Sequence, residues 1–172
     1  MSSGTFAWPA LVASTLAVGG ALTPPQLLPP PGDGDIRQVY WELQNRSEVW
    51  LTLEPKTTKG ERAPMLTFTF NFAGKSPAAP PSNVDVRAYA GTMYAPRADL
   101  VFVLDARQRI DLSSGRLLSG TPSDYVAGTM TIAVLKQMAV ASQVTGNALG
   151  FEFELTDAQR KAIAAFHDRI TR

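Results

Sequence analysis

Few side chains in this sequence have the types and spacing that catalysis requires. His167 is the single histidine, and histidine is the side-chain type that most readily exchanges protons near neutral pH. The chain has no cysteine, which excludes a thiol nucleophile, a disulfide and a zinc–thiolate site. No nucleophile can be paired with His167 from the sequence, so we interpret it as an edge-of-core or solvent-exposed residue of a helix and expect no catalytic residue.

Three acidic residues recur at six-residue steps, at Asp99, Asp105 and Asp111. This spacing matches neither the period of a strand nor that of a helix. Arginines alternate with these acids, so ion pairs at the ends of strands account for the pattern. A pair of carboxylates for glycoside hydrolysis would need a defined separation, and a hydrolase that uses these acids or His167 therefore stays an alternative.

The sequence also lacks the motifs that hold phosphates, nucleotides and metal ions. Gly74, Lys75 and Ser76 imitate the end of a P-loop, but Thr69 stands where the first glycine is needed and Pro77 interrupts the following helix. Asp33 and Asp35 are too few to supply the six or more oxygen ligands of Ca²⁺. We expect no cofactor and no metal site.

The composition is that of a folded protein with almost no net charge. Of the 172 residues, 45% are hydrophobic and 18% are charged, and 16 basic against 15 acidic residues give a formal net charge of +1. A chain of this length forms about one domain. The near-neutral balance does not favour nucleic acid as a partner.

The first 23 residues carry no charge and include an apolar run from Phe6 to Thr23. A run of this length suits either a short membrane span or the core of a signal peptide. Small residues recur along one side of the expected helix, which favours close packing against another membrane helix. The small residues are Ala13, Ala17, Gly20 and Ala21. An uncleaved anchor, a cleaved signal and a buried soluble helix all stay open.

Residues 24–35 hold five prolines in the eight positions from Pro24 to Pro31, followed by two glycines. Proline at this density excludes a helix and favours an extended, semi-rigid spacer. We therefore divide the chain into an N-terminal helix over 1–23, a spacer over 24–35 and a domain over 36–172. An anchor or a signal would place that domain outside the cytoplasm, in the periplasm or at the cell surface.

Alternating apolar and polar residues predict a β-hairpin at the start of this domain, around a turn at Asn45–Ser47. A three-residue turn pairs Leu43 with Val49 and places the aliphatic side chains on one face. In that register Tyr40 and Trp50 both point outward on the polar face. Exposed rings of these types contact protein partners or sugars.

Further periodic segments predict a sheet-rich domain that ends in a helix. Strands are expected over 66–73, 83–89, 100–104, 107–112 and 146–155, whereas 129–141 fits either a helix or a strand. Thr156 and Gln159 form a capping box before an apolar stripe that contains Phe166. The fold class is α+β: a mainly antiparallel β-sheet or sandwich with C-terminal helices, after the apolar N-terminal helix and the proline-rich spacer.

Three functions agree with these observations. The first is a non-catalytic accessory subunit, exported or tethered to a membrane through residues 6–23, that docks on other protein subunits of a complex. The second is an extracytoplasmic module that binds a glycan or a small ligand through Tyr40 and Trp50. The third is the hydrolase described above. Near-neutral charge and the missing catalytic motifs favour the accessory subunit.

Overall fold

The computed structural model describes residues 32–57, 59–91, 97–118 and 124–172. In these residues, ten strands form two antiparallel sheets of five strands each, and two α-helices complete the fold. The α+β class with predominant sheet, expected from the sequence, is thus confirmed. The apolar run and most of the proline-rich spacer lie outside the described residues.

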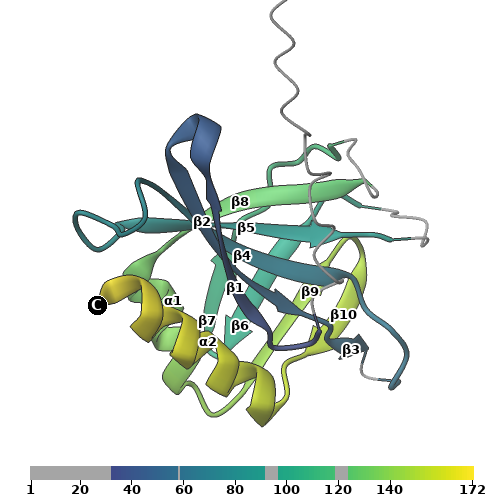
Figure 1. The fold of residues 1–172 in the computed structure, drawn as a ribbon. Coiled ribbons are helices and arrows are strands. Elements are labelled where there is room, and N and C mark those ends of the chain that lie inside the picture. Colours follow the sequence, from purple (N-terminus) through teal and green to yellow (C-terminus); the bar gives the residue numbers. More distant parts are fainter. Residues whose placement is uncertain (1–31, 58, 92–96, 119–123) are drawn as a thin grey trace, which may run out of the picture.

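The first sheet, here called sheet A, is built from the N-terminal half of the domain and one later strand. Its strand order is β1-β2-β4-β5-β8, and each neighbouring pair is antiparallel. The strands are β1 (Ile36–Trp41), β2 (Arg46–Leu53), β4 (Met65–Ala73), β5 (Asn83–Tyr89) and β8 (Tyr125–Thr131). The end of the β1–β2 hairpin extends beyond the other strands (Figure 1).

The second sheet, sheet B, has the order β3-β10-β9-β6-β7. Its strands are β3 (Lys56–Thr57), β6 (Leu100–Leu104), β7 (Gln108–Asp111), β9 (Val144–Ala148) and β10 (Phe151–Glu154). The predicted strand over 146–155 is therefore a hairpin instead. Its turn contains Leu149, which has a positive φ of 56°, followed by Gly150 at 87°.

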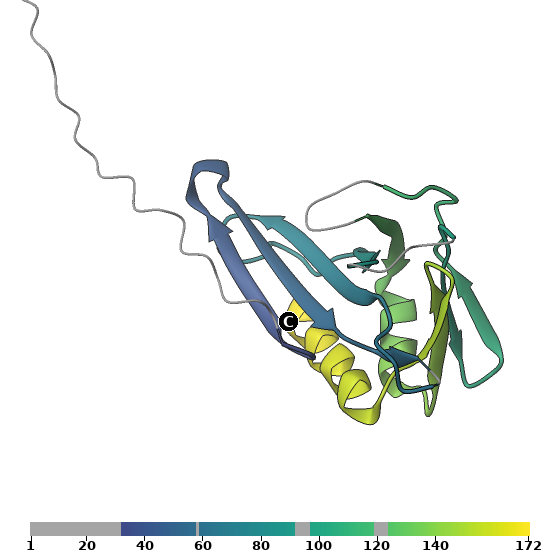
Figure 2. The same ribbon diagram turned by 90° about the vertical axis from the view of Figure 1, so that its right-hand side faces the viewer.

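The two helices pack against each other and against sheet A. Helix α1 (Ile132–Val140) follows β8 directly, and α2 (Asp157–Thr171) ends next to the C-terminus. Helix α2 contacts β2, and α1 contacts both α2 and β8. Figure 2 shows α2 beneath sheet A, with sheet B on the other side of α1. The open alternative over 129–141 is resolved as the end of a strand followed by a helix.

Phenylalanine rings join the two sheets in the core. Phe68 of sheet A lies 6.3 Å from Phe102 of sheet B, and Phe102 meets Phe153 edge-on at 5.8 Å, measured between ring centroids. All three side chains are fully buried. Because large aromatic side chains contribute most to burial in a small core, these rings set the distance between the sheets.

Helix α2 forms as its sequence predicts. The Thr156 hydroxyl accepts a hydrogen bond from the Gln159 backbone N–H, and the Gln159 side chain accepts one from the Thr156 N–H, which completes the capping box. The apolar stripe of Ile163, Phe166 and Ile170 is buried. The predicted capping box and the buried apolar face of α2 are confirmed.

Residues before Ile36 also contact the domain. The carboxylate of Asp33 accepts hydrogen bonds from the Glu54 backbone N–H at 2.8 Å and from the Gln159 side chain at 3.0 Å. The Gly34 N–H donates to the Thr52 carbonyl at 2.8 Å. The contacts of the folded domain therefore begin at the end of the proline-rich spacer.

Candidate functional site

The register predicted for the first hairpin is wrong. Trp41 is opposite Arg46 and Tyr40 is opposite Ser47, because a short 3₁₀ turn (Glu42–Gln44) and the left-handed Asn45 close the hairpin. A turn of this length changes the parity of the pairing, which exchanges the two faces of β1. Aliphatic side chains of β2 still face the core, but those expected from β1 do not.

Tyr40 and Trp50 consequently point to opposite faces of sheet A. Tyr40 shares a face with the buried Ser47, whereas Trp50 is one position out of phase with that face. The Tyr40 hydroxyl donates to Asn45 Oδ1 at 3.0 Å, and Lys75 Nζ lies 5.1 Å from the ring centroid. The two aromatic side chains do not form one binding surface.

The outer face of sheet A, on which Trp50 lies, carries a second aromatic group at another corner. Tyr89 and Tyr125 are cross-strand partners with ring centroids 5.3 Å apart. Arg87 lies 5.5 Å from the Tyr125 ring and donates to the Tyr89 hydroxyl at 3.5 Å. This hydrogen bond raises the pKa of Arg87 above its usual range. The arginine is therefore already engaged within the chain.

The shifted register exposes apolar side chains at the end of the hairpin. Trp41 is 46% exposed, and Leu43 is fully exposed. The predicted register paired Leu43 with Val49 on the aliphatic face, whereas Leu43 lies in the 3₁₀ turn. We call Trp41–Asn45 the hairpin tip.

The candidate catalytic residues are used in local contacts. His167 Nδ1 lies 3.4 Å from Asp168 Oδ1 on the same helix, and its side chain is only 15% exposed. Asp99 accepts from the Gly150 N–H, and Asp111 accepts from Arg109 and from the Ser113 N–H. Asp99 and Asp105 lie at opposite ends of β6. Asp99 and Asp105 therefore do not share one site.

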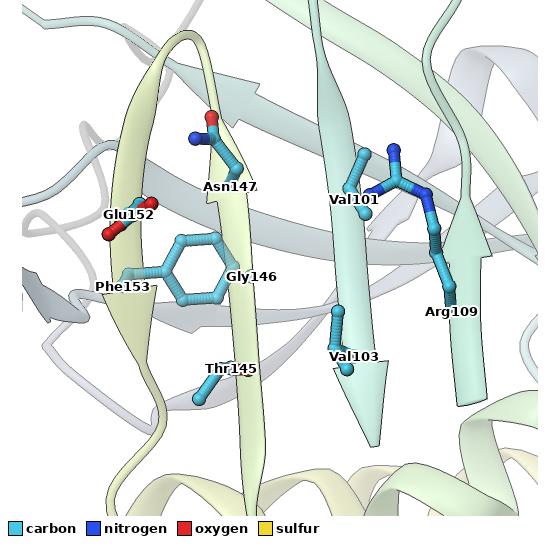
Figure 3. Close-up of a pocket in the computed structure, with 8 residues that line it drawn as sticks. All are labelled: Val101, Val103, Arg109, Thr145, Gly146, Asn147, Glu152 and Phe153. Carbon is cyan, nitrogen blue, oxygen red and sulfur yellow. The ribbon is translucent and has the colours of Figure 1, made fainter. Parts of the chain in front are cut away.

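A shallow depression of about 450 Å³ lies on the outer face of sheet B. Figure 3 shows Val101 and Val103 of β6 in its centre, Arg109 of β7 on one side, and Asn147 and Glu152 of the β9–β10 hairpin on the other. Sequence reasoning missed this site because its residues come from four strands. Cross-strand pairing alone brings them together, and no local motif could have indicated it.

Gly146 and Phe153 form the base of this depression. A Cβ atom at Gly146 would collide with the Phe153 ring and with the Val101 carbonyl oxygen, so the ring packs directly against the strand backbone (Figure 3). Phe153 is buried from the other side by Phe102. The base is therefore closely packed, as a preformed binding site requires.

The polar groups of the depression differ in how well they are paired. Arg109 donates to Asp111 at 3.1 Å. Glu152 has no ion pair among the described residues. Asn147 Oδ1 is shielded from solvent and has no hydrogen-bond partner in the described part of the chain. The Asn147–Glu152 side of the depression is therefore rich in unused acceptors.

No described group of three or more His, Cys, Asp or Glu side chains is placed to hold a metal ion. Neither described helix has the length and apolar content that crossing a bilayer requires. The residues proposed for membrane packing, Ala13, Ala17, Gly20 and Ala21, lie outside the described residues. No family model, curated protein or solved structure matches the chain.

Proposed function

We propose that this chain is a non-catalytic accessory subunit that docks on other proteins of an extracytoplasmic assembly. Residues 6–23 would export it or tether it to the membrane. The observation that carries the proposal is the hairpin tip, where Trp41 is 46% exposed and Leu43 is fully exposed. The hairpin extends away from the rest of sheet A, so a partner can reach both faces of the tip (Figure 1).

The chemistry of the tip favours a protein over a lipid bilayer as its partner. Tryptophan is over-represented among residues that contribute most to protein–protein affinity. Glu42 lies between Trp41 and Leu43, and a carboxylate is costly to transfer into hydrocarbon. At a protein interface the same carboxylate can stay hydrated at the rim. We therefore expect the partner to offer an apolar groove with a polar edge.

The test is to replace Trp41 and Leu43 together with serine and to measure the size of the native assembly. Both side chains are exposed, so we expect the variant to fold with a stability within about 0.5 kcal/mol of the natural protein. The assembly should dissociate, and a photo-crosslinker at position 43 should label one defined partner.

Val140→Ser is the matched control, because Val140 is another large exposed apolar residue, at 78%, and lies at the end of α1. The control should leave the assembly intact. An assembly that survives the double replacement, or that Val140→Ser disrupts equally, would contradict the proposal.

A further inference from the structure

We propose that the depression on the outer face of sheet B binds an alkylammonium group, either the side chain of a lysine or a free primary amine. This site is separate from the hairpin tip and does not depend on the proposed docking function. Its elements are the acceptors Glu152 and Asn147 and the apolar floor of Val101 and Val103 (Figure 3).

The acceptors stand side by side. Glu152 and Asn147 are register partners on neighbouring strands, which places their Cβ atoms about 5 Å apart on one face of the sheet. An ammonium group donates three hydrogen bonds, so it can reach a carboxylate and an amide oxygen at this spacing together. Glu152 would also supply the counter-charge.

Within the part of the chain that the structure describes, Asn147 is the residue of sheet B whose side chain lacks a hydrogen bond that its burial requires. Its Oδ1 is shielded and has no hydrogen-bond partner among the described residues, which destabilises the folded chain unless a ligand supplies a donor. A half-turn about the terminal side-chain bond exchanges the amide oxygen and nitrogen, and this torsion is a soft one for asparagine. Figure 3 draws the amide nitrogen of Asn147 on the side of Glu152, so this rotation would turn the oxygen toward Glu152, where an ammonium group could contact both.

The other side of the depression selects for an aliphatic chain. Val101 is the register partner of Asn147, and Val103 is the partner of Arg109. The Arg109 charge is neutralised by Asp111 at 3.1 Å, which reduces its repulsion of a cation. The methylene groups of an alkylammonium ion would therefore lie over valine, with the charged end at Glu152.

The experiment is a titration of the full-length chain with butylammonium chloride, followed through the backbone amide signals of Val101, Val103 and Asn147. We expect saturable shifts with a dissociation constant on the order of millimolar, as befits so small a ligand. Butanol, which lacks the charge, should not bind. N-acetyl-lysine methylamide forms a second arm, and the tighter of the two binders distinguishes a peptide lysine from a free amine.

Two variants test the assigned acceptors. Glu152→Gln should weaken binding about fivefold or more, because it removes the counter-charge. Glu48→Gln is the matched control on sheet A and should bind like the natural protein. Shifts that do not saturate, or that are equal in Glu152→Gln and the natural protein, would overturn the proposal.

Asn147→Leu separates a binding role of Asn147 from a structural one, because the two roles predict different changes in affinity and in melting temperature. Leucine has nearly the same shape without the unpaired oxygen, so the melting temperature should stay equal or rise while affinity for butylammonium falls. A stabilised variant with unchanged affinity would remove Asn147 from the site. The Glu152→Gln result decides the proposal even if this variant does not fold.

Discussion

At the scale of single residues, Gly146 shows how the absence of a side chain shapes a site. It sits in the middle of β9, where glycine is conformationally unfavourable, and its φ is not in the left-handed region. The reason for glycine is space, because the Phe153 ring and the Val101 carbonyl occupy the position of a Cβ atom. The same contact flattens the base of the depression.

Gly146→Ala should therefore destabilise the protein by about 1–3 kcal/mol, the usual cost of overpacking a core. Gly74→Ala is the control, since nothing lies within 4 Å of its added Cβ and only the positive φ of 75° opposes it. Denaturant unfolding measures both. A stable Gly146→Ala protein would show that the ring and the strand can separate at little cost.

Adjacent residues of α2 make a second comparison. Phe166 is fully buried between the helix and sheet A, whereas His167 lies at the edge of the core and contacts Asp168 on its own helix. Truncating a buried phenylalanine typically costs about 3–5 kcal/mol, which is a large share of the stability of a small domain.

We predict that Phe166→Ala prevents stable folding, whereas His167→Ala costs far less stability and leaves biological activity nearly unchanged. Thermal melting and a complementation assay measure the two properties. If His167→Ala gives a folded but inactive protein, the hydrolase alternative takes precedence over the accessory subunit.

At the scale of elements, the sequence predicted existence and type better than pairing. The strands predicted at 66–73, 83–89 and 100–104 are confirmed, and only the first begins one residue earlier than expected. The register predicted for the first hairpin is wrong because it depends on the conformation of the turn. Asn45 adopts φ 45°, and no periodic pattern in the flanking strands reports that choice.

The prediction of a single strand over 146–155 is wrong for the same reason, a turn that the periodic pattern does not report. The alternating residues of 146–155 continue through a turn at Leu149 and Gly150, so one predicted strand is two. Strand β8 was missed because its sequence passes directly into α1, where the period changes from two to 3.6 within the segment first assigned to one element. Single-segment periodicity cannot locate such boundaries.

The contact between the β6–β7 turn and the loop before β9 should make the stability of the fold depend on pH. Asp105 Oδ1 accepts hydrogen bonds from the Ser142 hydroxyl at 2.7 Å and from the Gln143 N–H at 3.0 Å. These bonds, first the one from Ser142 and then the one from Gln143, hold the pKa of Asp105 below its ordinary value of 3.8. Folding therefore favours the ionised form.

The contribution of Asp105 to stability is present above pH 3.8 and is lost as the pH falls through its lowered pKa. Asp105→Asn should be less stable than the natural protein at pH 7, and the difference should shrink in acid. Asparagine tolerates the positive φ of 49° at this position. Urea unfolding at several pH values measures the difference, and Ser142→Ala should reduce its pH dependence. A pH-independent difference would contradict the assignment.

At the scale of the whole molecule, the candidate site depends on contacts that are remote in sequence. Val101, Arg109, Asn147 and Glu152 meet because sheet B brings β6 and β7 next to the hairpin of β9 and β10. The sequence predicted most of these strands but not their order. Phe68, Phe102 and Phe153 pack between the sheets, and a list of strands does not contain such long-range contacts.

The last prediction concerns the N-terminal limit of the domain. Asp33 joins the start of the chain to Glu54 at the end of β2 and to the beginning of α2, through Gln159. Gln159 is 3% exposed, and its side-chain nitrogen donates to both Asp33 oxygens at 3.0 Å. Without Asp33 this buried donor loses its partner, which costs about 1–3 kcal/mol.

A chain that begins at Gly32 should therefore unfold cooperatively at a higher denaturant concentration than one that begins at Ile36. Asp33→Ala in the longer chain should reproduce most of the loss, which separates the effect of the carboxylate from that of chain length. Asp35→Ala is the control, because that carboxylate contacts only its neighbours Gly32 and Arg37 among the bonds described. Equal stability of the two chains would place the N-terminal boundary of the domain at Ile36. It would also show that the Asp33 contacts do not stabilise the fold.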